Sequence, residues 1–167
     1  MALTAQEEAY FQAVAGELLK SPSVQKMTKF TQHGSISTLE HSVSVAYYSY
    51  LICKRLHIRA DYRSLIRGAL LHDFFLYDWH CGNGNEGLHA FSHPKTALRN
   101  AEQQFTLSEK ERDIIVKHMW PLTITLPRYR ESVIVSCSDK FCSVIETLRL
   151  YPKYIPGSSG RFSYKKL

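Results

Sequence analysis

Six side chains in the middle of the sequence combine imidazoles with carboxylates. They are His41, His72, Asp73, His93, His118 and Asp139. Four imidazoles and two carboxylates suit first-row metals such as Fe, Mn or Zn better than Mg or Ca, which prefer shells made only of oxygen. The residue types therefore indicate a metal site, provided that the fold brings them together.

The first two histidines are expected to meet at one end of a helical pair. His41 lies in the first turn of a helix expected over 38–57, and His72 lies near the end of a helix expected over 62–75. The short connection between these helices implies antiparallel neighbours. At ~1.5 Å per residue, His41 lies ~22 Å before the end of its helix and His72 ~16 Å beyond the start of the next. Both side chains therefore reach a similar level.

A second pair of histidines repeats this construction. His93 precedes a helix expected over 94–105, and His118 ends an antiparallel partner expected over 109–119. His89 is a rival to His93, because the segment HAFSH brings both side chains near the site. A structural role is the alternative for each: His93 as a residue at a helix start before Pro94, and His118 as a favourable cation at a helix C-terminus.

The two aspartates lie on apolar helix faces. Asp73 shares a face with Ile66, Ala69 and Leu70, and Asp139 lies about the middle of a helix expected over 130–149. An unpaired buried carboxylate costs several kcal/mol, so these positions call for bound cations or buried arginines. Hydrogen bonding within the core is the plainer alternative. Cations are the more economical explanation for two such carboxylates.

Six ligands are enough for two metal ions. With Asp73 as a bridge, His41, His72 and Asp139 complete the shell of the first ion, while His93 and His118 hold the second. Two metals ~3.5 to 4 Å apart lower the pKa of a bridging water from about 15.7 toward ~7 and clamp the attacking and leaving oxygens of a phosphate ester. The predicted chemistry is hydrolysis, with Fe or Mn favoured over Zn.

The elements that must position these residues are helices. Three helix starts carry reciprocal capping boxes: Thr4 with Glu7, Ser37 with Glu40, and Ser108 with Glu111. Helical periodicity predicts helices over 4–20, 22–31, 38–57, 62–75, 94–105, 109–119 and 130–149, with Pro22 and Pro94 in first turns. No segment alternates over strand length, so the predicted fold is an all-α bundle.

Residues 76 to 93 are rich in Gly and Asn and are expected to form a long loop. Asp78, Trp79 and His80 in this loop are expected to line a substrate pocket. The side chains of Tyr47, Tyr48 and Tyr50 are expected to lie in the core or at its flank. Cys137 and Cys142 are expected to be small core fillers.

The order of the six residues resembles the HD-domain superfamily, which is named for its adjacent His-Asp pair. The resemblance covers residues 37–148 and includes LIRGALLHD, HAFSHP, HMWPL and SDKFCSVIE. It implies an all-α bundle with HD-type phosphohydrolase activity on phosphomonoesters, cyclic nucleotides or other nucleotides. It also implies that His41, His72, Asp73 and Asp139 form the common metal set, and that His93 and His118 mark the two-metal branch.

The sequence departs from this family at two points. Many members place Lys three residues after the Asp, where this chain has Leu76. Lys140 is the first candidate to meet substrate phosphate instead, and thus a catalytic residue beside Asp73, with Lys95 and Arg67 as weaker candidates. A solvated side chain is the alternative for each. The Glu-Asp pair of guanosine tetraphosphate hydrolases is also missing, which disfavours that substrate.

The whole chain fits one domain with a basic tail. It has 167 residues and a formal net charge of +6. Residues 149–167 carry five basic and no acidic side chains, so residues 1–148, the expected domain, are nearly neutral and nucleic-acid binding is disfavoured. No apolar run approaches the ~20 residues of a membrane span. The scattered cysteines and the polar N-terminus predict a cytoplasmic protein.

Two other functions are compatible with the same residues. The two-metal branch of the superfamily also includes di-iron oxygenases that cleave C–C or C–P bonds, and the ligand set alone does not separate them from hydrolases. The third function is a binding domain that a metal stabilises without turnover.

Overall fold

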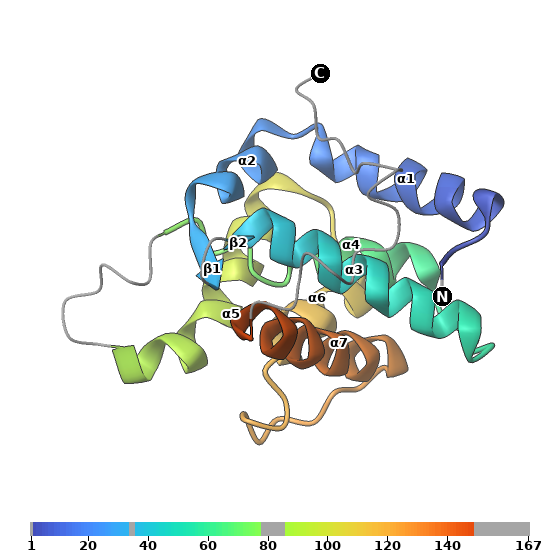
Figure 1. The fold of residues 1–167 in the computed structure, drawn as a ribbon. Helices are drawn as coiled ribbons and strands as arrows, with labels where there is room; N and C mark the ends of the chain where they lie inside the picture. The colour runs from blue at the N-terminus through green and yellow to red at the C-terminus, as the bar shows by residue number, and fades with distance from the viewer. Residues whose placement is uncertain (1, 34–35, 78–85, 149–167) are drawn as a thin grey trace.

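The computed structural model describes residues 2–33, 36–77 and 86–148. Within these ranges the chain is an all-α bundle, as predicted (Figure 1). Its helices are α1 (Ala5–Leu19), α2 (Pro22–Gln25), the 3-10 helix η1 (Lys26–Lys29), α3 (Thr38–Arg55), α4 (Tyr62–Leu71), α5 (Glu86–Gln104), α6 (Glu109–Lys117) and α7 (Arg130–Thr147). The strands β1 (Thr31–His33) and β2 (Ile36–Ser37) form a small antiparallel sheet.

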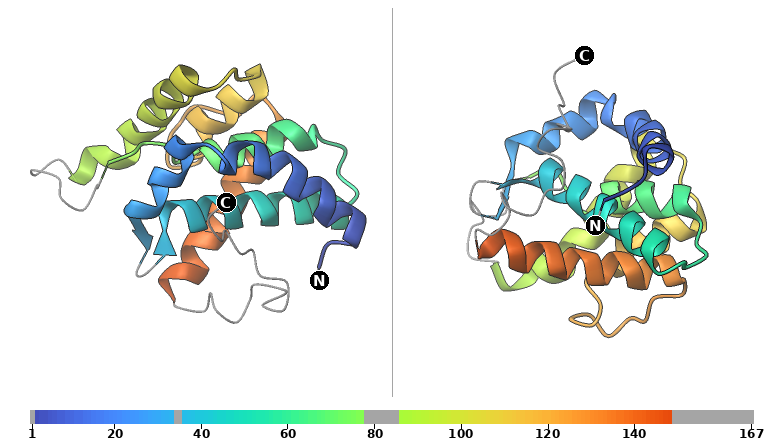
Figure 2. Two further views of the ribbon diagram at one scale, coloured as in Figure 1. Left: turned by 90° about the horizontal axis from the view of Figure 1, so that it is seen from above. Right: turned by 45° about the vertical axis from the view of Figure 1, so that its right-hand side comes forward.

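Helices α3, α4, α6 and α7 make the centre of the bundle. Helix α3 packs against α4 and α7, and α6 packs against α4, α5 and α7. Helix α1 covers α4 on the side of the molecule away from α7 (Figures 1 and 2). The start of α3 and the ends of α4 and α6 therefore come together beside α7.

The core is built from the apolar faces of these helices. Phe11 of α1, Leu39 of α3 and Leu70 of α4 are fully buried, and Ile114 of α6 fills the space between α4 and α6. Gly68 permits this close approach: a Cβ at this position would lie 2.7 Å from the Ile114 side chain. The α4–α6 packing also brings His72 and His118 close together, because these residues follow the ends of the two helices.

The helix starts were predicted well because their signals are local. All three capping boxes form, with both reciprocal hydrogen bonds at Thr4, Ser37 and Ser108. Asp61 also caps α4 by accepting a hydrogen bond from the Ser64 amide at 3.1 Å. These caps satisfy backbone amides that the first helical turn leaves unpaired.

The loop predicted over residues 76–93 is wrong at its end, because α5 begins at Glu86 and contains His93. Pro94 therefore lies inside a helix and not in a first turn. An internal proline removes one hydrogen bond and costs ~3 kcal/mol in an isolated helix. Tertiary contacts outweigh this local preference: the His93 ring lies 5.8 Å from the Phe75 ring and bonds with His118.

The helix predicted over 22–31 also differs. It breaks into α2 and η1, and its last residue, Thr31, begins β1. Thr38 explains the change of direction, because its amide and hydroxyl both donate to the Phe30 carbonyl, at 2.8 and 3.2 Å. The sheet is too short for a periodicity signal, which is why the sequence did not indicate it.

Among the described residues, no helix is long and apolar enough to cross a membrane.

Candidate metal centre

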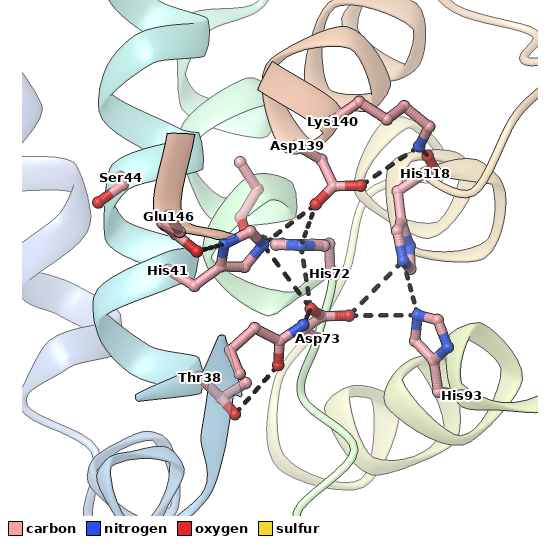
Figure 3. Close-up of polar contacts among 12 residues, drawn as sticks. Thr38, His41, Ser44, His72, Asp73, His93, His118, Asp139, Lys140 and Glu146 are labelled. Atoms are coloured by element: carbon pink, nitrogen blue, oxygen red, sulfur yellow. Dashed lines mark hydrogen bonds and ion pairs between the residues drawn. The ribbon is translucent and has the colours of Figure 1, made fainter. Parts of the chain in front are cut away.

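The six predicted metal ligands converge on one buried site (Figure 3). They come from five places in the fold: the first turn of α3, the turn after α4, the interior of α5, the end of α6 and the middle of α7. Their side chains are His41, His72, Asp73, His93, His118 and Asp139, and none of these residues is more than 7% exposed. The geometric prediction of two converging hairpins is therefore confirmed, although His93 lies within a helix and does not open one.

Asp73 lies between two pairs of histidines. Its Oδ2 is 3.3 Å from Nε2 of His72 and 3.9 Å from Nε2 of His41. Its Oδ1 is 3.3 Å from Nε2 of His93 and 3.5 Å from Nε2 of His118. Each carboxylate oxygen thus faces a different pair, which is the arrangement expected of a carboxylate that bridges two cations.

Asp139 completes one side of this arrangement. Its Oδ1 lies 3.1 Å from Nε2 of His41 and 3.6 Å from Nε2 of His72. We call His41, His72 and Asp139 the His41 cluster, and His93 with His118 the His93 cluster. Asp73 is shared by both.

Hydrogen bonds to the far ring nitrogen orient three of the imidazoles. Nδ1 of His72 donates to the Ala69 carbonyl at 2.7 Å, and Nδ1 of His118 donates to the Ile115 carbonyl at 2.8 Å. Nδ1 of His41 donates to Oε2 of Glu146 at 2.8 Å. Such bonds fix the tautomer and direct the Nε2 lone pair to the opposite side, as in histidines that bind metals. All three Nε2 atoms point into the site.

Glu146 and Gln32 are members of the site that the sequence reasoning missed. Glu146 is 3% exposed and lies seven residues after Asp139, so two turns of α7 put both carboxylates on one face. That spacing was the available signal. Gln32 of β1 donates from Nε2 to Oδ2 of Asp73 at 2.8 Å. No sequence signal marked it, because its placement depends on the small sheet.

Two buried polar atoms of the predicted metal ligands lack a hydrogen-bond partner among the described residues. Nε2 of His72 and Oδ1 of Asp73 are buried with no hydrogen-bond partner among the described residues. Nε2 of His93 and Nε2 of His118 lie only 2.9 Å apart. Because Nδ1 of His118 carries its proton, its Nε2 is an acceptor there. Cations in the site would give Nε2 of His72 and Oδ1 of Asp73 the partner that they lack.

The electrostatics of the site also favour cations. Burial alone would lower the pKa of His41, but hydrogen bonds to Asp139 and Glu146 raise it to about 9. Burial opposes a charge on His72 too, yet the charge of Asp73 and a hydrogen bond to Asp139 raise its pKa to about 10. Protons on these two rings balance buried carboxylates in the metal-free chain. A divalent cation would take over that role.

Burial and the neighbouring charged groups also shift the pKa values of Asp73, Asp139 and His118. Burial would raise the pKa of Asp73, but the neighbouring charge of His72 holds it well below its usual range. Burial would also raise the pKa of Asp139, which its hydrogen bond with His41 lowers instead. Burial, reinforced by the charge of His72, lowers the pKa of His118 to about 3, so this ring is neutral and ready to act as a ligand.

The residues present therefore fit metal ions. Ligand atoms of His41, His72 and Asp73 lie within 4.8 Å of one another, and so do those of Asp73, His93 and His118. The two groups share only Asp73. The site is a buried His/Asp cluster compatible with an HD-type metal centre, while the number and identity of the ions stay predictions.

The three candidate phosphate-binding cations have different surroundings. Lys140 reaches the site: its Nζ donates to the His118 carbonyl at 2.7 Å and lies 3.3 Å from Oδ2 of Asp139. Arg67 is wrong as a candidate, because its buried Nε bonds Oε1 of Glu111 at 2.5 Å in the α4–α6 contact. Lys95 is exposed on α5.

The burial predicted for the tyrosines and cysteines is only partly confirmed. Tyr47 and Tyr50 are buried and Tyr48 is partly buried, as predicted. Cys142 is buried, but Cys137 is exposed, so its prediction as a core filler is wrong. Asp78, Trp79 and His80 lie outside the described residues, and so does the side chain of the rival ligand His89.

No family model, curated protein or solved structure matches this chain. The buried cluster and the helical fold therefore carry the functional argument.

Proposed function

We propose that this protein is a metal-dependent phosphohydrolase of the HD type that binds two divalent ions. The observation that carries the proposal is the position of Asp73. Its two oxygens face separate histidine pairs at 3.3 to 3.9 Å, and one of them has no hydrogen-bond partner among the described residues. A single ion would leave one of these pairs without a function.

The residues divide into two shells around the shared carboxylate. The His41 cluster would hold one ion and the His93 cluster the other, with Fe or Mn favoured over Zn because imidazole and carboxylate are mixed. Bound divalent ions supply Lewis acidity, which lowers the pKa of a coordinated water and offsets the charge of a phosphate ester. Glu146 orients His41, and burial of the whole site strengthens every interaction within it.

Lys140 supports a phosphoester substrate in preference to a neutral one. Its ammonium is about one-third exposed and lies at the edge of the site beside Asp139. In this position it adds a positive charge near the place where a phosphate group would approach. We propose a small phosphoester, including nucleotides, as the substrate, and a cytoplasmic location for the protein.

A panel of phosphoesters tests this function. The full chain, purified without chelator and supplied with Mn²⁺ or Fe²⁺, is assayed for phosphate release with and without oxygen. We expect hydrolysis that does not depend on oxygen, that a chelator abolishes, and that Asp139→Asn lowers by at least the 10²- to 10³-fold typical of losing one key electrostatic contact. Glu109→Gln, an exposed charge change on α6, should leave the rate unchanged.

Other outcomes would overturn the proposal. Turnover that requires both iron and oxygen would assign the protein to the oxygenase branch. Tight metal binding without turnover of any panel member, combined with unfolding when the metal is removed, would indicate a metal-stabilised binding domain.

A further inference from the structure

The outward face of α7 is unusually apolar. Its exposed side chains are Val133, Cys137, Phe141 and Val144, followed by Leu148 at the helix end; we call these five the outer α7 stripe. Phe141 is 50% exposed, Val144 57% and Leu148 62%. Thr147 is the one other exposed residue between 133 and 148, so this face carries no charge. Its length is roughly 22 Å.

The inward face of the same helix is largely polar. Glu131, Ser132, Ser136, Asp139 and Glu146 are all buried, and the last two belong to the metal centre. A surface helix normally turns its polar side to solvent and its apolar side to the core. Helix α7 does the reverse, because its inner side serves the site. Its outer side is therefore an exposed apolar surface of the kind that packs against a partner.

The outer α7 stripe is complementary to itself. The positions 133, 137, 144 and 148 map onto one another when the stripe is read backward about its own midpoint, between residues 140 and 141. In an antiparallel pair of two such helices, Val133 faces Leu148 and Cys137 faces Val144, and the two copies of Phe141 lie next to each other near the axis, each offset from it by less than one residue. A surface that matches its own copy in this way is what a twofold interface requires.

Further exposed apolar residues lie in the connection from α6 to α7. The connection from α6 to α7 runs next to α7 (Figures 1 and 2) and exposes Leu122, Ile124 and Leu126, by 65%, 98% and 69%. A standard interface buries ~800 Å² per partner, which exceeds what five partly exposed side chains supply. The connection adds three exposed apolar side chains on a segment next to α7.

We propose that the outer α7 stripe is a homodimer interface, in which α7 of one copy packs antiparallel against α7 of a second copy around a twofold axis near residues 140 and 141. This proposal does not depend on the phosphohydrolase activity. It assigns α7 two roles, with carboxylates for the site on one face and a self-complementary apolar surface on the other.

Sedimentation velocity of the full chain across a range of concentrations tests the association. We expect a dimer for the wild-type chain and a monomer for Val144→Lys, because each dimer would bury two lysines against Cys137 without a partner charge. Ala13→Lys is the matched control, since Ala13 is exposed on α1, across the molecule from α7 (Figure 1). This control should remain a dimer, and circular dichroism should show that both variants fold.

Disulfide trapping tests the register. In a Cys81→Ser background, Val144→Cys should give a covalent dimer on mild oxidation, with the new thiol joined to Cys137 of the second copy. Thr147→Cys should not, because its partner position is shifted by three residues. Cys137 alone should not crosslink either, since two copies of it lie ~10 Å apart along antiparallel helices.

Three results would overturn the proposal. The first is a wild-type chain that stays monomeric at the highest concentration, as expected if residues 149–167 cover the stripe. The second is a dimer that Val144→Lys leaves intact. The third is disulfide trapping through two copies of Cys137, which would indicate that the two helices are parallel.

Discussion

The His41 cluster and the His93 cluster face the same carboxylate but differ in how the protein supports them. In the His41 cluster, a buried glutamate orients one ring, a second carboxylate lies at 3.1 Å, and both imidazoles are completely buried. The His93 cluster depends on two imidazoles and Asp73, and its pKa pattern keeps His118 neutral. Two more carboxylates make the first cluster the stronger cation site.

This difference predicts that the two clusters bind cations with different affinities. A cation in the His41 cluster replaces protons that already balance buried charge, so it should bind tightly and stabilise the fold. A cation in the His93 cluster meets fewer negative groups and should exchange more readily.

Removal of the shared carboxylate should affect both clusters. We expect Asp73→Ala to lose both ions, because Asp73 is the one carboxylate that both clusters share. Metal analysis of the purified chain measures the loss, and Glu109→Gln serves as the control. Retention of two equivalents by Asp73→Ala would show that the carboxylate is not a bridge.

Replacing one histidine in each cluster should show that the two clusters differ in metal affinity and in their effect on thermal stability. His93→Ala is expected to bind one equivalent of metal with nearly wild-type thermal stability, whereas His41→Ala should lose the tighter ion and unfold at a lower temperature. Metal analysis and thermal unfolding, both with and without chelator, check this pair. Equal losses in the two variants would contradict the asymmetry.

Glu146→Gln should weaken only the His41 cluster. The amide keeps the shape of the side chain but loses the charge that raises the basicity of His41, so the metal affinity should fall by about 10- to 100-fold. A competitive titration with a metal indicator measures this affinity. The control is Glu131→Gln, another buried carboxylate of α7, which bonds the Asp61 amide and Lys110 far from the site.

The pH dependence of binding should differ between the clusters as well. His41 and His72 have pKa values of about 9 and 10 in the metal-free chain, so both are protonated at neutral pH and must lose their protons to bind metal. Affinity at this cluster should therefore rise as the pH rises toward 9. The pKa of His118, about 3, predicts no such proton release from its ring. Calorimetry in buffers of different ionisation enthalpy, on wild type and His93→Ala, measures the protons released.

Much of this arrangement was predictable from sequence. The capping boxes identify where helices begin, and helix rise per residue then places His41 and His72 at one level. Those signals are local, and they correctly predicted that the six chemical side chains would converge. The His-Asp resemblance led to the same residues.

The remaining features depend on tertiary contacts. Helix α5 extends through Pro94 because His93 contacts His118, at the end of α6, and Phe75. Local helix propensity does not predict such tertiary contacts. Gln32 reaches Asp73 only because a two-residue strand pairs beside it. The exposed position of Cys137 was missed because the face of α7 that holds Asp139 is polar, which reverses the usual pattern of burial.

Metal analysis of the full chain, combined with a crystal structure recorded at the absorption edge of the metal found, tests whether Asp73 bridges two metal ions. We expect two ions ~3.5 to 4 Å apart, each contacted by a different oxygen of Asp73, one beside His41 and the other beside His93. A chain that binds no transition metal, or an ion that Asp73 does not contact, would contradict it.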